Sequence, residues 1–105
     1  MSKSSTTIES RMRPIHPGEI LREEFLVPLQ LSGNALALAL GVPANRVSGI
    51  LRERRSVTAD TALRLARYFG TTAGFWLNLQ KAFELRTTEF ISGHAIAKRV
   101  HPRAA

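Results

Sequence analysis

Five successive segments of the chain carry apolar residues at helical spacing, separated by short polar or glycine-containing stretches. The first helix is predicted to start at Pro17, because a proline fits the first helical turn and Glu19 suits the positive end of a helix. Pro28 is expected to end it, since a proline interrupts a helix interior. Its expected buried residues are Ile20, Leu21, Phe25 and Leu29, and its expected outward residues are Glu19, Glu23 and Glu24.

The second segment, residues 35–40, alternates with period two, which on pattern alone resembles a strand. Both members of the alternation, alanine and leucine, are apolar and strong helix formers, so a helix is predicted instead. Ser32 suits the N-cap of this helix, and Gly41 suits the residue after its end. The residues expected to face the core are Leu36, Ala37 and Leu40.

Two further helices are predicted between Pro43 and Gly70. The third helix runs from Pro43 or Ala44 to Arg52, before a short polar loop. Thr58 is expected to cap the fourth helix, and Gly70 to end it. The residues expected to be buried on the fourth helix are Ala62, Leu63, Ala66 and Phe69.

The second and third helices carry the residue spacing of a helix-turn-helix, the two-helix unit that places its second, recognition helix in the DNA major groove. Ala37 is small where the recognition helix would cross it, and Gly41 supplies the positive φ that ends the preceding helix sharply. Three apolar residues then close the corner between the two helices, namely Val42, Val47 and Ile50. An ordinary pair of antiparallel helices would not require this register.

A fifth helix is predicted from Ala73, behind the N-cap Thr72, to about residue 87. Its apolar surface is wider than one small core requires, which favours burial against a second copy in a two-fold dimer. The predicted dimer interface consists of Phe75, Trp76, Leu79, Gln80 and Phe83. The alternative is that Trp76 and Phe83 fill the core beneath the first and fourth helices.

The predicted elements divide the 105-residue chain into three parts. Residues 1–15 form a mobile N-terminal arm, in which Arg11 and Arg13 could follow the DNA backbone or minor groove. Residues 16–88 form a helix-turn-helix domain with a C-terminal dimerisation helix. Residues 89–105 form a C-terminal tail, for which the sequence leaves a short strand, a docked arm and disorder open.

The chain is strongly basic, with 15 lysines and arginines against 8 acidic residues, a net charge of +7 and a pI near 11.3. This balance points to a polyanionic partner, with nucleic acid first. Cysteine is absent, which favours a cytoplasmic setting and excludes a disulfide framework or a thiolate metal site. No apolar run reaches the roughly 18 residues of a membrane span, and the first residues lack the apolar core of a secretory signal.

Positive charge is concentrated on the recognition helix and the segment after it. Residues 46–67 contain six arginines but only two acids, Glu53 and Asp60. Asn45 lies at the helix start, where an asparagine can bond bidentately to adenine, whereas arginines at the helix end suit phosphate contacts. Small residues on the same face let the helix approach the bases. The predicted DNA-binding residues are Ala44, Asn45, Arg46, Ser48, Gly49, Arg52, Arg54 and Arg55.

The distribution of histidines argues against catalysis and metal binding. His16, His94 and His101 lie at or beyond the edges of the predicted helical core, and residues 17–93 contain neither histidine nor cysteine. A His-based triad or a His/Cys metal cluster inside the core is thereby excluded. No enzymatic activity, metal or cofactor is expected, and His16 is expected to cap its helix.

Three blocks of sequence accompany the helix-turn-helix. They are His16-Pro17-Gly18-Glu19-Ile20-Leu21-x-Glu23-Glu24-Phe25-Leu26, Val57-Thr58-Ala59-Asp60-Thr61-Ala62-Leu63-Arg64-Leu65-Ala66 and Phe75-Trp76-Leu77-Asn78-Leu79-Gln80. Together they resemble the HigA-type antitoxins of bacterial toxin–antitoxin modules, which belong to the Xre/Cro-like DNA-binding proteins and include relatives of virulence-associated protein I. The resemblance covers about residues 14–88.

The resemblance implies an all-α, five-helix, lambda-repressor-like domain that dimerises through its last helices. It implies a homodimer that binds a palindromic double-stranded operator upstream of its own operon and represses it. It also implies neutralisation of a HigB toxin, a RelE-like ribonuclease that cuts mRNA on the ribosome. An orphan or phage-type regulator without a toxin is one alternative, and a protein-interaction module whose positive face docks an acidic partner is another.

Two positions depart from the pattern of the family that the chain resembles. Gly33 stands where Xre-type proteins often carry a polar residue, usually glutamine, at the start of the first motif helix. Glu53 or Arg54 replaces the glycine that usually follows the recognition helix. With Gly33 in place of a polar residue, the phosphate or base contact usual in the family is absent. With Glu53 or Arg54 in place of glycine, the geometry of the loop after the recognition helix is expected to differ.

Overall fold

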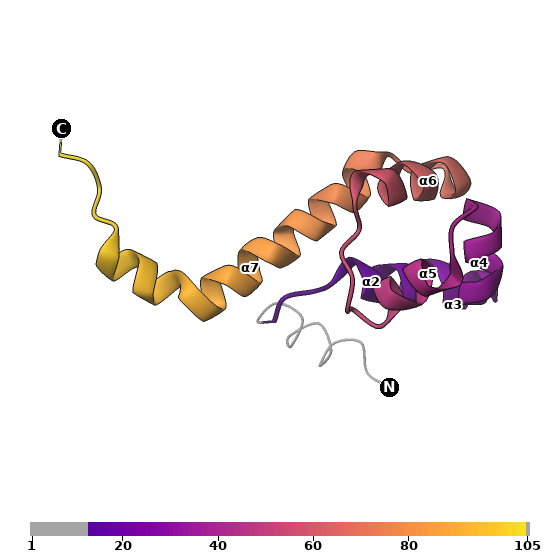
Figure 1. Cartoon of the computed structure of the whole chain (residues 1–105), viewed down its shortest axis with the longest axis horizontal. Helices are drawn as coiled ribbons and strands as arrows, with labels where there is room; N and C mark the ends of the chain where they lie inside the picture. Colours follow the sequence, from indigo (N-terminus) through magenta and orange to yellow (C-terminus); the bar gives the residue numbers. More distant parts are fainter. Residues whose placement is uncertain (1–12, 105) are drawn as a thin grey trace.

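The computed structural model describes residues 13–104, in which the chain forms five helices and no strand (Figure 1). The first helix covers residues 17–29 without a break and comprises α2 (Pro17–Ile20), a π-helical segment η1 (Leu21–Leu26) and α3 (Val27–Leu29). The others are α4 (Gly33–Leu40), α5 (Ala44–Leu51), α6 (Ala59–Phe69) and α7 (Ala73–Arg99). The predicted all-α, five-helix fold is thus confirmed, while the predicted arm up to residue 12 lies outside the described residues.

The π-helical segment of the first helix accommodates Pro28. The N–H of Val27 donates to the carbonyl of Arg22, five residues back, so the helix widens just before the proline. The helix therefore ends after Leu29 rather than at Pro28, with Gln30 at a φ of +53°. A bond that spans one residue more than in an α-helix also changes the angular spacing of the side chains on the helix. The prediction that Leu29 is buried was wrong, since it is 60% exposed and Leu26 is buried instead.

The helix-turn-helix consists of α4 and α5, and its predicted signals are confirmed. The Ser32 hydroxyl accepts a hydrogen bond from the Ala35 N–H at 3.1 Å, and Gly41 ends α4 with a φ of +70°. The N–H of Val42 then donates to the Ala37 carbonyl at 3.1 Å, which closes the turn. The buried residues of the unit are Leu36, Ala37, Leu40, Val47 and Ile50.

The fourth helix, α6, begins and ends where predicted but presents a different face to the core. Thr58 caps its start and Gly70 ends it with a φ of +76°. Leu65 is buried, whereas Leu63 is 64% exposed, so the predicted burial of Leu63 was wrong. The core face follows Ala62, Leu65 and Phe69 at helical spacing, which places Leu63 outside it.

The last helix, α7, is much longer than predicted. It continues for 27 residues to Arg99 instead of ending near residue 87, so a strand, a docked arm and disorder are all wrong for residues 88–99. Figure 1 shows α7 leaving the compact body of the other helices and projecting away from it. The boundary drawn at residue 88 therefore does not coincide with a helix end, and the division of the chain into parts stays a prediction.

Trp76, in the first turns of α7, has no exposed surface and packs in the centre of the core. The ring centroids of Trp76 and Phe25 lie 5.0 Å apart, and those of Phe25 and Phe69 lie 4.8 Å apart. The indole N–H donates to the Thr71 hydroxyl at 2.8 Å, so its polar atom is satisfied as well. Trp76 thus anchors α7 to the first helix and to α6, in agreement with the alternative interpretation of this residue.

Candidate nucleic-acid interface

The predicted DNA-binding residues lie together on α5 and on the loop that follows it, residues 52–58. Ala44 and Asn45 are exposed at the start of the helix, while Arg46, Ser48 and Gly49 are half-buried. Arg52, Arg54 and Arg55 are exposed at the end of the helix and in the loop. The three exposed arginines thus gather at the end of the recognition helix and in the loop, while the exposed residues at its start are Ala44 and Asn45.

Both acids of this basic stretch are held in ion pairs. The Asp60 carboxylate accepts from Arg46 at 2.6 Å and from Arg64 at 2.9 Å. These two bonds, with that from Arg64 the larger influence, hold the pKa of Asp60 below its ordinary value. The Glu53 carboxylate lies 3.5 Å from the Arg22 guanidinium. Positive charge therefore dominates the exposed surface of the recognition helix and its loop.

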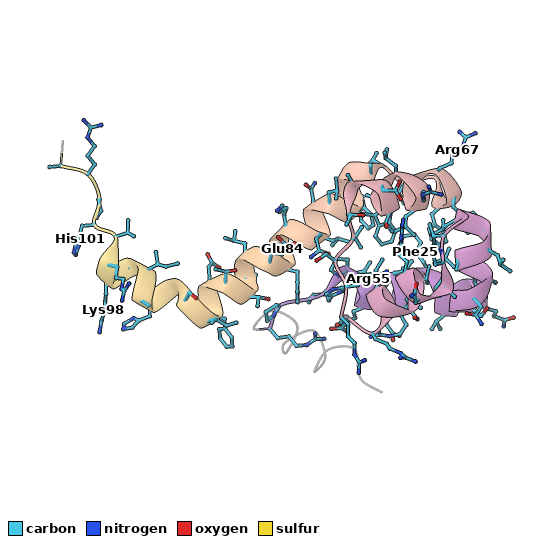
Figure 2. The ribbon with its side chains drawn as sticks, in the orientation of Figure 1. Phe25, Arg55, Arg67, Glu84, Lys98 and His101 are labelled. Carbon is cyan, nitrogen blue, oxygen red and sulfur yellow. The ribbon has the colours of Figure 1, made fainter. Side chains whose placement is uncertain are left out.

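Arg46 was predicted to reach bases or phosphates, but its guanidinium is bound to Asp60 across the gap between α5 and α6. Arg64 is occupied too, because it donates to the Leu40 carbonyl at 2.8 Å and so satisfies the C-terminal end of α4. Arg67 points outward from α6 (Figure 2). Two of the six arginines in residues 46–67 thus hold the helices together.

Gly49 has a local explanation that differs from the predicted one. A Cβ at this position would lie 3.2 Å from the Cβ of Arg55 and 3.5 Å from its Cδ. The N–H of Arg54 also donates to the Gly49 carbonyl at 2.9 Å. The open side of Gly49 therefore accommodates the returning loop, while the predicted close approach of this residue to the bases stays a prediction.

The two departures from the family pattern also have structural counterparts. A Cβ at Gly33 would lie 3.0 Å from the Cδ1 of Leu51, so the first residue of α4 packs against the end of α5. Glu53 has a φ of +62°, in the left-handed region that favours glycine. Glu53 is thus the position at which the loop geometry would ordinarily use a glycine, and its carboxylate pairs with Arg22 instead.

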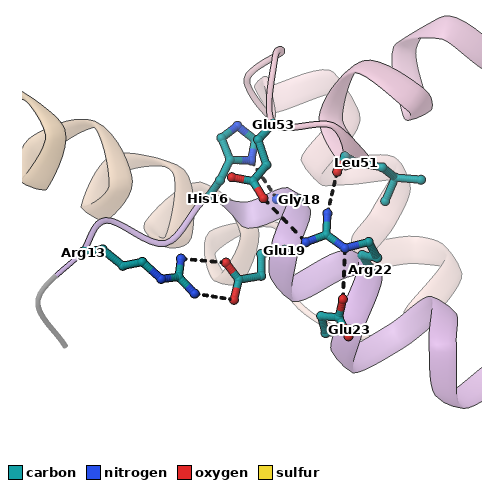
Figure 3. Close-up of polar contacts among 8 residues, drawn as sticks. All are labelled: Arg13, His16, Gly18, Glu19, Arg22, Glu23, Leu51 and Glu53. Carbon is teal, nitrogen blue, oxygen red and sulfur yellow. Dashed lines mark hydrogen bonds and ion pairs between the residues drawn. The ribbon is translucent and has the colours of Figure 1, made fainter. Parts of the chain in front are cut away.

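A polar cluster fixes the first helix against the end of α5 (Figure 3). Arg22 donates to the Leu51 carbonyl at 2.6 Å, which satisfies the end of the recognition helix. Arg13 donates two hydrogen bonds to Glu19 at 2.9 and 3.0 Å and thereby holds the pKa of Glu19 below its ordinary value. Of the two arginines predicted to follow DNA from the N-terminal arm, Arg13 is bound to Glu19 of the first helix. Arg11 lies outside the described residues.

His16 caps the first helix, as predicted. Its Nδ1 accepts a hydrogen bond from the Gly18 N–H at 2.8 Å, and its ring contacts the ring of Phe83 edge-on at 4.8 Å between centroids. The side chain is buried, and this burial lowers the pKa of His16 below its ordinary value. The cap requires an unprotonated Nδ1, so burial and capping favour the same neutral form.

The predicted dimer residues divide into two groups. Trp76 and Gln80 are buried within the protomer itself and present no surface to a second copy. Phe75 is 38% exposed, and Leu79 and Phe83 are half-buried. A further set of apolar residues is exposed along the projecting part of α7 and directly after it, namely Leu85, Phe90, Ile91, Ile96 and Val100.

Sequence reasoning missed three polar side chains that shape this interface. Arg22 and Arg64 satisfy the ends of the two motif helices, and Gln80 binds the backbone of the loop after α5. One signal for Gln80 was present, since it follows Trp76 at the four-residue spacing of a shared helix face. The backbone groups that these side chains bind, at Leu51, Leu40 and Val57, lie 29, 24 and 23 residues away in the chain, which no local pattern reveals.

Neither a metal centre nor a membrane span is found within residues 13–104. In this range no group of three or more His, Cys, Asp or Glu side chains is arranged to hold a metal ion. No helix within it is long and apolar enough to cross a membrane.

The sequence and the fold of the chain are similar to those of known helix-turn-helix proteins. Residues 21–76 match the family described as Helix-turn-helix (HTH_3). Virulence-associated protein I of Dichelobacter nodosus is 57% identical over 81 residues, which cover 77% of this chain and 75% of the relative. The structure of the Pseudomonas aeruginosa antitoxin HigA with the higBA promoter matches with a TM-score of 0.86 and 50% identity, over 88% of this chain and all of the other. The antitoxin GraA in complex with its operator matches with a TM-score of 0.84 and 56% identity, over 89% of this chain and 94% of the other.

Proposed function

The chain belongs to the Xre-like helix-turn-helix family and to its HigA-type antitoxins, and we propose that it is a DNA-binding repressor that autoregulates its own operon and neutralises a HigB/RelE-like toxin. The observation that carries the DNA-binding part is the position of Arg52, Arg54 and Arg55. All three are exposed next to the recognition helix, while the two nearby acids are engaged in ion pairs. Structures of similar proteins with a promoter or an operator support DNA binding as such.

The residues of this face divide by their chemistry. Asn45, Ser48 and Arg46 are the base readers in the proposal, with Arg46 exchanging Asp60 for DNA. Arg52, Arg54 and Arg55 hold phosphates and set the register of the protein on the duplex. Ala44 and Gly49 contribute by their small size, Ala44 toward the groove and Gly49 beneath the loop.

The proposed DNA-binding form is a homodimer on a palindromic operator. Two recognition helices related by a two-fold axis would enter successive major grooves about 34 Å apart. The last helix supports this arrangement, because α7 projects from the body and exposes Phe90, Ile91 and Ile96. Phe75, Leu79 and Phe83 are the predicted dimer residues that keep some exposed surface, whereas Trp76 and Gln80 support α7 from within.

The toxin part of the proposal rests on family membership and assigns no residue to toxin contact. The proposal places the protein in the cytoplasm, where the operator and the mRNA-cleaving toxin are found, and gives it no enzymatic role. A small RelE-like reading frame directly upstream of the gene favours the antitoxin, and co-expression with its product tests neutralisation. Without such a neighbour, the orphan regulator becomes the better description.

Binding to DNA from directly upstream of the chain's own gene tests the proposal first. The purified protein is titrated, at two salt concentrations, with this duplex and with a random duplex of equal length. Selective binding by a dimer is expected, with a salt dependence that reflects the phosphate contacts. Weak binding that is equal on both duplexes and lost at the higher salt would overturn the repressor. Binding to neither would favour the protein-interaction module.

A further inference from the structure

One buried polar side chain on α7 binds the loop that follows the recognition helix. Gln80 is 4% exposed, and its Oε1 accepts a hydrogen bond from the backbone N–H of Val57 at 2.8 Å. Its Nε2 donates to the Ser56 hydroxyl at 3.3 Å and to the Glu84 carboxylate at 2.9 Å. The acceptor and both donors of the amide are thus in use.

The loop depends on this contact because no helix offers a backbone acceptor for the N–H of Val57. Val57 is buried, but it lies after the end of α5 and before the start of α6, so no helix provides an acceptor for its N–H. The first part of the loop is fixed differently, since the N–H groups of Glu53 and Arg54 donate to the Ile50 and Gly49 carbonyls at the end of α5. Gln80 therefore fixes the second part of the loop.

We propose that Gln80 is a positioning residue for DNA binding, which holds the loop so that Arg54 and Arg55 meet phosphates in register. This inference rests on the proposed function. The two arginines precede Val57 by three and two residues, so a shift of the Val57 backbone displaces them directly. Because Gln80 belongs to α7, the contact also links the projecting helix to the DNA-binding face. Glu84, which accepts from Gln80, lies further along α7 (Figure 2).

The chemistry of the contact requires an amide. Val57 needs an acceptor, while the Glu84 carboxylate needs a donor, and a glutamine side chain provides both. A glutamate at position 80 would retain the acceptor but place two carboxylates together, which is unfavourable. Combining Gln80→Glu with Glu84→Gln restores a matched pair, because the new amide at position 84 donates to the new carboxylate.

The first experiment compares Gln80→Ala with Asn78→Ala, the same change at an exposed amide of α7. The affinity for the upstream duplex is measured over a range of salt concentrations, with the dimer content and the folded fraction recorded in each sample. Gln80→Ala is expected to bind about tenfold more weakly, with a salt slope reduced by about 0.9 for each phosphate that the protein no longer binds. Asn78→Ala is expected to match the unchanged protein.

A merely structural role for Gln80 would lower stability without changing the salt slope of the folded dimer. A loss of affinity explained wholly by dissociation of the dimer would likewise overturn the inference. The rescue variant makes the same distinction, since Gln80→Glu should reduce the salt slope and the affinity and the double change with Glu84→Gln should recover both. If the unchanged protein does not select its upstream duplex, the proposed function fails, whereas selective binding that Gln80→Ala leaves intact refutes only the inference.

Discussion

Gly18 lies directly against the carbonyl oxygen of Ile50, where a Cβ on the glycine would come within 1.9 Å of that oxygen. The same carbonyl accepts a hydrogen bond from the Glu53 N–H at 2.9 Å, so it cannot easily move away. The start of the first helix therefore rests on the end of the recognition helix with no room for a side chain.

The contact predicts that Gly18→Ala destabilises the fold. Overpacking at such sites typically costs about 1–3 kcal/mol, and here the obstruction is backbone rather than a flexible side chain. Denaturant unfolding measures the change. Gly74→Ala is the matched control, because the nearest atom to its new Cβ is 3.9 Å away, and it should be neutral or slightly stabilising. Equal stabilities for the two variants would show that the first helix shifts freely.

His16 predicts a pH-dependent stability. Burial lowers its pKa in the folded state below the ordinary 6.5, so the unfolded chain binds more protons as the pH falls through that value. The free energy of unfolding contributed by this group is therefore fully present above pH 6.5 and declines below it, until the pH reaches the folded-state pKa. Thermal unfolding at a series of pH values measures this.

The non-titrating cap His16→Asn is the control for this prediction, because an asparagine side chain accepts the same kind of hydrogen bond at an N-cap. Its stability should depend less on pH below 6.5, the ordinary pKa of histidine. An unchanged pH dependence in His16→Asn would assign the effect to other groups.

The proposed roles on the recognition helix predict different consequences for Asn45 and Arg54. Asn45→Ala should relax discrimination at one base pair and cost about 1–3 kcal/mol of binding free energy on the operator. Arg54→Ala should weaken binding to all sequences and flatten the salt dependence. Titrations on operator, single-substitution operators and random DNA separate the two effects. Equal losses on operator and random DNA for both variants would contradict this division of roles.

The ion pair between Arg46 and Asp60 predicts that Asp60→Asn tightens DNA binding. The change frees Arg46 and removes a negative charge beside the recognition helix, so affinity should rise several-fold and depend more steeply on salt. Glu24→Gln makes the same change in charge on the first helix and serves as the control. If both variants bind equally tightly, the gain comes from net charge rather than from release of Arg46.

The exposed apolar side of α7 predicts that Phe90→Glu weakens self-association. Phe90 is 82% exposed in the protomer, so the change should leave thermal stability of the monomer nearly unaltered while disrupting an apolar dimer contact. Sedimentation analysis over a range of protein concentrations measures the dimer dissociation constant. An unchanged constant would place the dimer interface elsewhere on the chain.

The parts of the fold that the sequence predicted are those set by local chemistry. Ser32, Thr58 and Thr72 cap helices through hydroxyls that reach N–H groups three residues away, and Gly41 and Gly70 end helices through a positive φ. Each device involves only a few neighbouring residues, so its residue type and position suffice to reveal it.

The errors arose where distant contacts or an unusual local geometry prevailed. Pro28 was compatible with a helix end, but the helix continues to Leu29 after a π-helical segment, and Leu26 rather than Leu29 is buried. The pattern around Leu63 and Leu65 offered two apolar faces, and only packing against the other helices selects one. The extension of α7 to Arg99 escaped detection because its apolar residues have no core of the same protomer to follow.

The candidate site was predicted in its location but only partly in its internal contacts. The sequence shows where each arginine stands, but the role of its guanidinium depends on which groups the fold brings next to it. Arg46 and Arg64 meet Asp60, whereas Arg54 and Arg55 extend from an exposed loop. Gln80 illustrates the same limit, since its helix position indicates burial but its bond to Val57 depends on the tertiary fold.

The packing of Arg55 against Gly49 has a practical consequence for changing which DNA sequence the protein reads. A Cβ introduced at Gly49 would lie 3.2 Å from the Cβ of Arg55, so Arg55 would have to shift by a few tenths of an ångström to admit it. A library for altered target preference should therefore keep Gly49 constant and vary Ala44, Asn45 and Ser48. Such a design separates the positions proposed to face the bases from the position that accommodates the loop.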